Sequence, residues 1–466
     1  MNPLKVDVAI IGAGSAGMSA YKAARKHTDR VAVIEQGPYG TTCARVGCMP
    51  SKLLIAAADH AHAAATGERF GVTVAGLKID GAAVMARVRR ERDRFVGFVL
   101  DEVDRWPDAH KLSGAARFEA PGRLRVADTP IEAARVIIAT GATPAVPAGW
   151  RARLGDRLVV NDDVFDWNAL PESVAVVGTG VVGLELAQAL HRLGVRVRLF
   201  GRSQRVGPLT DPALQAAVAA WIDATLPYSG NVGEPEVGRD GDGVVVTWQD
   251  ERGRPRRERF AFVLAAAGRR PALDGLDLDK AGVPLDARGR PVFDPATGRI
   301  GDTPVFIAGD ADDDRPVLHE AADEGRIAGD NAGRYPDVRP AARRTPLTIV
   351  FTDPQMAIAG ASHADLTRRG VAFARGAASF ADQGRARTMG RNLGEMRVYA
   401  GKADGRLLGA ELFGPDAEHL AHLLAWAIQR GDTVADALAA PFYHPVVEEG
   451  LRTALQDLAR ALRDAI

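Results

Sequence analysis

The sequence predicts an α/β protein with two similar βαβ units and a third, C-terminal α+β domain. The chain has 466 residues, more than one compact core usually holds, so about two to four domains are expected. A short apolar run, a glycine-rich turn and a helical pattern occur in this order twice, 166 residues apart. From about residue 345 the apolar segments alternate like antiparallel strands, and two helical stretches follow them.

The first unit begins with a buried strand at residues 6–11 and ends with a second strand at residues 31–34. Between them lies a G-x-G-x-x-G turn that opens a helix reaching about Lys26. In such a turn the first glycine permits the tight bend, the second lets the backbone approach a diphosphate, and the third packs helix against strand. The pattern predicts a dinucleotide site formed by Gly12, Gly14, Gly17 and, for the ribose hydroxyls, Glu35.

The second unit has strands at residues 173–177 and 195–200 around another glycine turn. Eighteen residues after the third glycine, where the first unit has its acid, stands Gly201, followed by Arg202. Loss of the acid and gain of an arginine suit a 2′-phosphate and favour NADP over NAD. The alternative is an exposed arginine without a role. Two Rossmann-like dinucleotide-binding domains are therefore expected, the second built on Gly178, Gly180 and Gly183.

The bulk composition excludes several classes of protein. Lys+Arg and Asp+Glu are both 59, so no general charge attracts nucleic acid or an acidic membrane. No stretch approaches the ~18–20 apolar residues of a membrane span, and the N-terminus lacks a signal-peptide pattern, which predicts a cytoplasmic protein. The two cysteines, Cys43 and Cys48, have no further ligands near them at zinc spacing, so redox chemistry is expected and a metal site is not.

The segment around these cysteines carries the most specific motif, Gly40-Thr-Thr-Cys43-Ala-Arg-Val-Gly-Cys48-Met-Pro-Ser-Lys52. It closely resembles the redox-active disulfide segment of the pyridine nucleotide–disulfide oxidoreductases, most of all the dihydrolipoyl dehydrogenases. Four intervening residues on a helical segment can bring two thiols within disulfide reach. The resemblance also covers both glycine turns and the segments Thr140-Gly141, Gly268-Arg-Arg-Pro271, Gly309-Asp310, Leu318-His319, Phe351-Thr-Asp-Pro354 and Tyr443-His444-Pro445-Val-Val-Glu-Glu449.

This resemblance implies a homodimeric enzyme that uses FAD to pass electrons between NAD or NADP and a small dithiol or disulfide. It assigns Cys48 as the thiolate that faces the flavin and Cys43 as the thiol that exchanges with substrate sulfur. Lys52 is expected beside the flavin, paired with Glu185, and Asp310 at the ribityl chain. Further cofactor contacts are implied at Thr42, Ala116, Thr140, Gly141, Gly268, Gly309 and His319.

His444 and Glu449 are the acid–base pair that the resemblance implies. Thiol exchange needs a base for the attacking thiol and an acid for the leaving one, and an imidazole suits both tasks near neutral pH. Glu449 would orient the ring and stabilise its charged form. In the family this pair comes from the partner subunit, so each site of a homodimer is expected to draw on both chains.

Several positions depart from the family pattern and leave the substrate undefined. Arg45 replaces a small polar residue, Thr41 a glycine and Val446 the customary threonine. The leading expectation is a dihydrolipoyl dehydrogenase-like enzyme acting on lipoamide, with membership of a multienzyme complex left open. The alternative is an NADPH-dependent reductase of a low-molecular-weight disulfide, resembling glutathione reductase.

Three other readings fit less well. Mercuric reductases and large thioredoxin reductases need a further C-terminal thiol or selenol pair, which a chain with two cysteines lacks. Relatives that act on oxygen or peroxide use a single cysteine. A non-catalytic subunit that holds FAD for structure or signalling would tolerate loss of Lys52 or His444, and both are present.

The domain boundaries are placed between these segments. Residues 1–150 are expected to form the first part of an FAD-binding domain, 151–270 an NAD(P)-binding domain, 271–343 a central part of the FAD-binding domain, and 344–466 a dimerisation domain. Asp312 to Asp314 are expected in a solvated loop.

Overall fold

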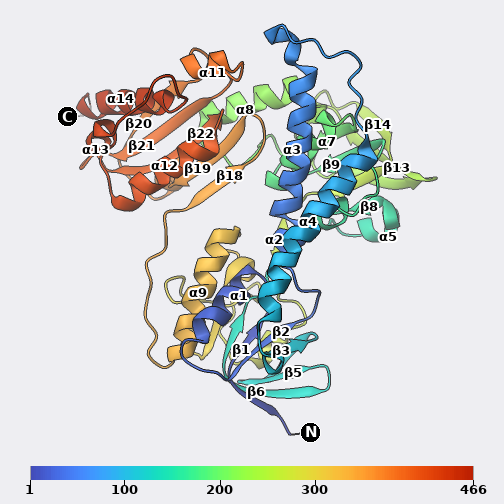
Figure 1. The fold of residues 1–466 in the computed structure, drawn as a ribbon, viewed down its shortest axis with the longest axis vertical. Coiled ribbons are helices and arrows are strands. Elements are labelled where there is room, and N and C mark those ends of the chain that lie inside the picture. The colour runs from blue at the N-terminus through green and yellow to red at the C-terminus, as the bar shows by residue number, and fades with distance from the viewer. Residues whose placement is uncertain (1, 465–466) are drawn as a thin grey trace.

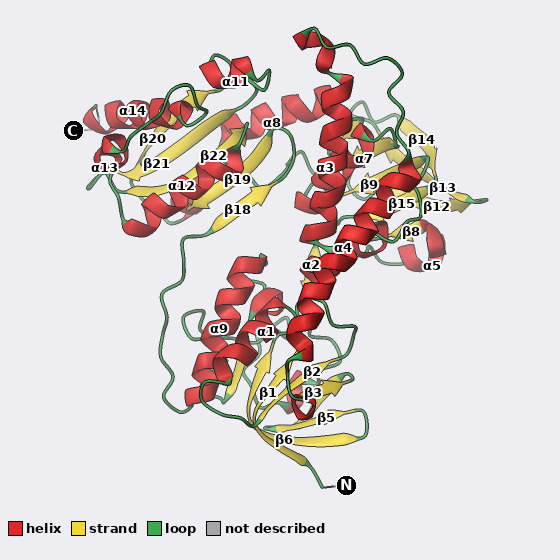
Figure 2. Cartoon of the chain, viewed as in Figure 1, coloured by secondary structure: helices red, strands yellow, loops and turns green. Residues whose placement is uncertain are grey.

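The computed structural model describes residues 2–464 of the chain. Figure 1 shows three groups of elements: an N-terminal group in blue that also contains a yellow-to-orange segment from later in the chain, a green middle group, and an orange-to-red C-terminal group. Each group combines helices with a sheet, as Figure 2 shows by colour. The predicted α/β class is confirmed.

Seven strands form the first sheet, in the order β3-β2-β1-β6-β5-β4 with β17 paired to β6. Its centre is parallel, and β4 and β5 extend it as an antiparallel hairpin. The strands predicted for the first unit are confirmed within a few residues. The bounds are β1 (Leu4–Ile11), β2 (Val31–Glu35), β3 (Lys111–Ser113), β4 (Ala116–Ala120), β5 (Arg123–Val126), β6 (Thr129–Ile138) and β17 (Val305–Ile307).

Two helices distant in the sequence pack on each other beside this sheet, α1 (Ser15–Ala24) and α9 (Leu318–Arg334). Their backbones come unusually close, since a Cβ at Gly325 would lie 2.1 Å from the carbonyl oxygen of Ala16, and one at Gly329 would lie 2.3 Å from that of Ala20. Only glycine permits this approach. The chain leaves its first sheet after β6, at Ile138, and returns to it only at β17, which begins at Val305.

The middle group is built on a five-stranded parallel sheet in the order β11-β10-β9-β15-β8. A three-stranded antiparallel sheet, β12-β13-β14, leads into its strand β15. The bounds are β8 (Leu158–Val159), β9 (Ser173–Val177), α7 (Val181–Arg192), β10 (Arg196–Phe200), α8 (Pro212–Thr225), β11 (Tyr228–Ser229), β12 (Glu236–Asp240), β13 (Gly243–Gln249), β14 (Pro255–Phe260) and β15 (Phe262–Ala265).

The C-terminal group holds the antiparallel sheet β18-β19-β22-β21-β20, as predicted. Two longer helices, α12 and α14, bury leucines and alanines against it. The bounds are β18 (Leu347–Val350), β19 (Gln355–Gly360), α10 (His363–Arg368), β20 (Phe373–Ser379), α11 (Gly384–Thr388), β21 (Glu395–Gly401), β22 (Leu407–Gly414), α12 (Ala417–Arg430), α13 (Val434–Ala439) and α14 (Glu449–Arg463).

Two long helices lie between the first two groups. In Figure 1, α3 and α4 run between the N-terminal sheet and the middle group, and α3 packs on both α4 and α7. None of the helices within residues 2–464 is long and apolar enough to cross a membrane. The other bounds are α2 (Thr42–Val46), α3 (Cys48–Ala65), α4 (Gly81–Asp104), β7 (Ala142–Pro144), α5 (Trp150–Leu154), α6 (Asn161–Val164) and β16 (Arg269–Pro271), with one-turn helices at 67–70, 108–110, 155–157, 278–280 and 309–311.

Candidate active site

The two cysteines lie in the helical segment that the sequence predicts, and this segment consists of two consecutive helices. Cys43 stands in the first turn of α2, and Cys48 is the first residue of α3. The chain bends between them at Gly47, where a Cβ would lie 3.0 Å from the carbonyl oxygen of Thr42. Both thiols are free. Ending one helix and starting the next places the second thiol at a helix N-terminus, which favours a thiolate.

A hydrogen bond between the thiols separates their acidities. The Cys43 thiol donates to the Cys48 sulfur, and this bond, together with the ammonium of Lys52, lowers the pKa of Cys48 to about 7. The same hydrogen bond and burial raise the pKa of Cys43. In the reduced pair Cys48 is therefore the thiolate near neutral pH, whereas Cys43 keeps its proton until a base removes it.

Lys52 and Glu185 form a partly buried ion pair beside the thiols. The Lys52 Nζ donates to Glu185 Oε2 at 2.8 Å and lies 4.5 Å from the ring centroid of Phe351. The other carboxylate oxygen of Glu185, which is 4% exposed, accepts from the backbone N–H of Phe351 at 2.9 Å. The cation is thus held in place by a carboxylate, a backbone contact and an aromatic face. The structure brings together the two residues that the sequence predicted as partners.

The same face of α7 also binds the chain segment that follows Phe351. Gln188 lies three residues after Glu185 on α7, and its amide group donates to the Asp353 carbonyl at 2.9 Å and accepts from the Asp353 N–H at 2.8 Å. Gln188 was not predicted from the sequence as a site residue. Its spacing from Glu185 was the available signal, because residues three apart share a helix face.

The first glycine turn has the construction that a diphosphate needs. A Cβ at Gly12, whose φ is 106°, would lie 2.3 Å from the carbonyl oxygen of Ala139, and one at Gly17 would lie 1.9 Å from that of Gly12. The middle glycine, Gly14, faces open space, with no atom within 4 Å of a Cβ placed there. The outer glycines close the turn and the middle one leaves room for a ligand at the N-terminus of α1.

The second turn repeats this construction. A Cβ at Gly178 would lie 2.1 Å from the carbonyl oxygen of Ala266, and one at Gly183 would lie 1.9 Å from that of Gly178. Gly180 again faces open space. The chain therefore has two diphosphate-sized cradles of the same design, which fits one FAD and one nicotinamide dinucleotide.

Glu35 stands beside the first turn at the end of β2. Its Oε2 accepts from the N–H of Ala13 at 2.7 Å, and its Oε1 accepts from the N–H of Gly37 at 2.8 Å. Each oxygen keeps a second lone pair. The carboxylate is oriented by the turn and can still accept hydrogen bonds from ribose hydroxyls.

Three segments predicted to contact the flavin converge at the carboxyl ends of β6, β15 and β17. The short strands β7 and β16 pair, which brings Thr140-Gly141 next to the segment that begins at Gly268. The Thr140 hydroxyl is buried and has no hydrogen-bond partner within residues 2–464. Burial raises the pKa of Asp310, and the guanidinium of Arg269 opposes the rise. An unpartnered hydroxyl and a desolvated carboxyl group fit a polar cofactor.

The other predicted cofactor positions lie on several different elements. Thr42 is exposed at the first residue of α2, and His319 is exposed in the first turn of α9. Ala116 is buried at the start of β4. The N–H of Gly309 donates to Glu324 Oε2 at 2.8 Å.

The expectation of a solvated loop at residues 312–314 is wrong for its first aspartate. Asp313 and Asp314 are exposed, but a carboxyl oxygen of Asp312 is buried. Burial and the neighbouring charge of Glu324 raise the pKa of Asp312 to about 8. Burial and the neighbouring Glu324 therefore favour the protonated form of Asp312.

His444 pairs with Glu449 at the start of α14. The His444 Nδ1 lies 3.0 Å from Glu449 Oε1 and 3.2 Å from Oε2, and this contact lowers the pKa of Glu449. The imidazole side chain is 80% exposed. Figure 1 places α13 and α14, which flank His444, at the outer edge of the C-terminal group, away from α2. The structure unites His444 with Glu449 but not with the cysteines of the same chain.

Arg202 lies just after β10, at the end of the second strand of the second unit, where a bound coenzyme is expected. Gly201 is buried just beyond β10, and its N–H donates to the Ser229 carbonyl at 2.9 Å. The side chains of Arg202 and Arg205 are exposed, and Arg205 donates to the Pro208 carbonyl at 3.0 Å. Arg202 is the better placed of the two to meet a ligand.

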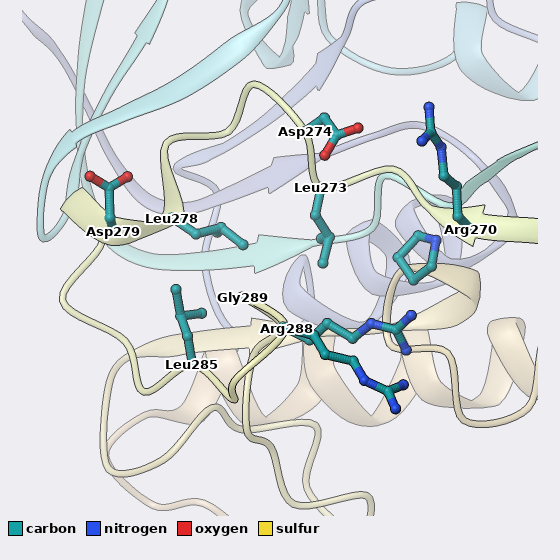
Figure 3. Close-up of a pocket in the computed structure, with 10 residues that line it drawn as sticks. Arg270, Leu273, Asp274, Leu278, Asp279, Leu285, Arg288 and Gly289 are labelled. Atoms are coloured by element: carbon teal, nitrogen blue, oxygen red, sulfur yellow. The ribbon is translucent and has the colours of Figure 1, made fainter. Parts of the chain in front are cut away.

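Two cavities lie outside these predicted sites. One has a volume of about 350 Å³; Figure 3 shows it lined by Arg270, Leu273 and Asp274 from one side and by Leu285, Arg288 and Gly289 from the other. A second, of about 660 Å³, lies between α3, α7, α8 and residues 390–393. Within residues 2–464 no group of three or more His, Cys, Asp or Glu side chains is placed to hold a metal ion.

Family comparison gives two matches that together cover most of the chain. Residues 6–325 match the model described as pyridine nucleotide-disulphide oxidoreductase, and residues 347–455 match the dimerisation domain of that family. A dihydrolipoyl dehydrogenase from Haloferax volcanii is 31% identical over 97% of this chain and 96% of its own length. A mercuric reductase from Streptomyces lividans is 31% identical over 97% of this chain and 95% of its own length.

Solved structures share the whole fold. The crystal structure of LpdA from Mycobacterium tuberculosis superposes with a TM-score of 0.81 at 25% identity, covering 99% of this chain and 100% of that one. The HOCl-induced flavoprotein disulfide reductase RclA from Escherichia coli, as the Cu(II) complex of its C43S mutant, gives a TM-score of 0.80 at 23% identity, with 99% of both chains covered.

Proposed function

The chain belongs to the pyridine nucleotide–disulphide oxidoreductase family, and we propose that Cys43 and Cys48 carry its reaction. The protein is an FAD-dependent oxidoreductase that uses NAD(P) and acts on sulfur groups. It carries the dimerisation domain of the family and is a homodimer. We assign the FAD-binding domain to residues 1–150 and 271–343, the NAD(P)-binding domain to 151–270 and the dimerisation domain to 344–466.

One observation carries the assignment of the cysteines: two hydrogen-bonded thiols of unequal acidity lie beside the Lys52–Glu185 pair. When bound, FAD supplies the electron relay between the nicotinamide and this pair. Gly12, Gly14, Gly17 and Glu35 would hold its adenosine diphosphate part, and Thr140 and Asp310 would meet its inner part. The hydrogen bond from Cys43 and the ammonium of Lys52 lower the pKa of Cys48, so its thiolate would face the flavin.

The exchange with substrate can be written in full for disulfide reduction. A base removes the proton of Cys43, whose thiolate attacks one sulfur of the substrate and forms a mixed disulfide while the other sulfur leaves and takes up a proton. The Cys48 thiolate then attacks the Cys43 sulfur, which closes the Cys43–Cys48 disulfide and releases the second substrate sulfur as a thiolate. Two electrons pass to the substrate. Oxidation of a dithiol runs the same steps in reverse.

The partner subunit's His444 is the base and acid that we assign to these steps. Its ring is exposed on its own chain and oriented by Glu449 through Nδ1, so Nε2 is left to exchange protons with a thiol on a neighbouring subunit. The raised pKa of Cys43 requires such a base at neutral pH.

A lipoamide-type dithiol is the substrate we propose first, because two of the relatives at 31% identity are dihydrolipoyl dehydrogenases. Reduction of a small disulfide by NADPH is the second candidate, supported by Gly201 and Arg202 in place of an acid at the coenzyme edge. With a single cysteine pair in the chain, this protein lacks the extra thiols of mercuric reductases. Such a reducing dithiol chemistry suits a cytoplasmic setting.

One steady-state comparison tests both candidates. Purified enzyme is assayed with NADH and NADPH against lipoamide and glutathione disulfide, and with NAD⁺ and NADP⁺ against dihydrolipoamide. The first proposal predicts the higher kcat/KM with the lipoyl substrate. A higher value with glutathione disulfide and NADPH would favour the second. If Cys43→Ser or Cys48→Ser keeps normal turnover with either substrate, the assignment of the cysteine pair is wrong.

A further inference from the structure

The carboxyl end of the second strand differs between the two nucleotide units. In the first unit the residue eighteen positions after the third glycine is Glu35, whose carboxylate accepts from the N–H of Ala13 inside the turn. In the second unit the matching position is Gly201. The space beside Gly201 holds the phenol of Tyr228, which comes from the neighbouring strand β11.

Two glycines make room for this phenol. A Cβ at Gly201 would lie 2.8 Å from the Tyr228 hydroxyl oxygen and 3.2 Å from a methyl carbon of Thr179, which belongs to the glycine turn. A Cβ at Gly230 would lie 2.4 Å from the same hydroxyl oxygen. Gly201 does not have a positive φ, so its backbone would accept any residue. The tyrosine, together with Thr179 and the nearby backbone, is what demands glycine at position 201.

The Tyr228 hydroxyl is an exception among buried polar groups. It has no hydrogen-bond partner within residues 2–464, and burial raises its pKa. A buried hydroxyl without a partner is destabilising. It therefore adds nothing to stability at this position, yet it occupies the place from which a side chain at position 201 would reach the ribose.

We propose that Tyr228 is a specificity-determining residue for the nicotinamide coenzyme. By filling the space beside Gly201 it keeps a carboxylate from the end of β10, where an acid would accept hydrogen bonds from the adenosine ribose of NAD and repel the 2′-phosphate of NADP. Arg202, which follows Gly201, is then the charged side chain at the end of β10. The inference rests on the proposed coenzyme site and deepens it by naming the residue that excludes the acid.

The first test measures thermal unfolding without coenzyme. Gly201→Ala should lower the Tm clearly in the native background and by less in Tyr228→Phe, because loss of one oxygen removes the closest contact. Tyr228→Phe alone should keep or raise the Tm. Gly238→Ala is the matched control, since a Cβ there meets no atom within 4 Å and its effect should be the same in both backgrounds. An equal Tm loss from Gly201→Ala in both backgrounds overturns the inference.

The second test measures the Kd values of NAD⁺ and NADP⁺ by titration calorimetry. Gly201→Asp alone should weaken both coenzymes, whereas Gly201→Asp with Tyr228→Phe should shift the ratio of the two Kd values toward NAD⁺ by about tenfold. If Gly201→Asp alone gives the full shift, Tyr228 does not set the choice. If the unmodified enzyme prefers NAD⁺, the proposed preference for NADP is wrong. This failure can be distinguished from a failure of the Tyr228 inference, because the unfolding test is done without coenzyme.

Discussion

At the scale of single residues, the reaction depends on which of two thiols is ionised. The Cys48 thiolate is stabilised first by the hydrogen bond from Cys43 and then by the ammonium of Lys52. The Cys43 thiol is held protonated by the same bond. Unequal acidity gives each sulfur its own task, since the thiolate is the reactive form.

The pH dependence of alkylation tests this division. In the reduced enzyme we expect the Cys48 thiolate to be half-formed at about pH 7 and to disappear as the pH falls below that value, because its pKa is lowered to about 7. Iodoacetamide labelling of the Cys48 peptide, followed by mass spectrometry, measures the profile. Lys52→Met should move it to higher pH by removing a positive charge. A profile unmoved by Lys52→Met, or one centred near the ordinary thiol pKa, would contradict the assignment.

Arg202 offers a second residue-scale prediction. We expect Arg202→Ala to weaken NADPH binding roughly tenfold to a hundredfold, because an arginine–phosphate contact contributes about 1.5–3 kcal/mol. NADH should bind nearly as before. Arg205→Ala is the control, because the Arg205 side chain already donates to the Pro208 carbonyl. Equal loss with both coenzymes would show that Arg202 does not bind the phosphate.

At the scale of elements, the departure at Thr41 has a structural consequence. Thr41 precedes α2 with φ 58° and ψ 149°, a conformation that suits glycine, and its hydroxyl accepts from the N–H of Ala44 at 3.2 Å. The helix that carries Cys43 therefore begins at a strained residue that also caps it.

Two substitutions separate the strain from the cap. Thr41→Ala loses the cap and keeps the strain, so we expect it to lower the free energy of unfolding by about 1 kcal/mol. Thr41→Gly loses the cap but relieves the strain, which costs about 1–3 kcal/mol in such regions. The glycine variant should thus be the more stable of the two in thermal unfolding. The reverse order would mean that position 41 is unstrained.

The contact of Asp312 with α9 predicts a stability that depends on pH. The pKa of Asp312 is raised to about 8 by burial and by Glu324, well above the ordinary value of an unfolded aspartate. Between those two values the folded chain holds a proton that the unfolded chain has lost, so stability should fall as the pH rises toward 8. Asp312→Asn should flatten this slope in denaturant titrations at several pH values, and Asp313→Asn, at an exposed position, should leave it unchanged.

At the scale of the whole molecule, α2 and α14 of one chain lie apart (Figure 1), so a site that uses both needs two subunits. His444 is exposed, and the helices α13 and α14 that flank it lie near the outer edge of the C-terminal group, away from α2 (Figure 1). A two-fold dimer can bring each imidazole to the cysteines of the other chain, so that each of two sites is built from both subunits.

Mixed dimers test the shared site. His444→Gln should lower turnover by ~10²–10⁴-fold, the usual contribution of a positioned acid–base group, while coenzyme binding stays unchanged. Glu449→Gln should cost less, because the ring remains. Inactive Cys43→Ser and His444→Gln subunits should regain activity when mixed, since one site of each hybrid receives both intact halves. No recovery after verified subunit exchange would rule out a shared site.

Much of this protein follows from local sequence pattern. Strands at the βαβ units, both glycine turns and the antiparallel C-terminal sheet are dictated by side-chain period and by the steric freedom of glycine, which act within a few residues. The pairing of Lys52 with Glu185 and of His444 with Glu449 came from family resemblance, and the structure shows both contacts. The bend at Gly47 between the cysteines was not predicted, because a C-x-x-x-x-C spacing suits one helix as well as two.

Only the tertiary structure decided the contacts between residues far apart in the chain. Phe351 covers Lys52, Tyr228 fills the space beside Gly201, and one carboxyl oxygen of Asp312 is buried near Glu324. No local pattern encodes these neighbours, because whether a polar side chain is dry or wet depends on what the rest of the chain packs against it. Sequence pattern therefore determined where the reactive groups stand, and packing decided which of them carry a charge.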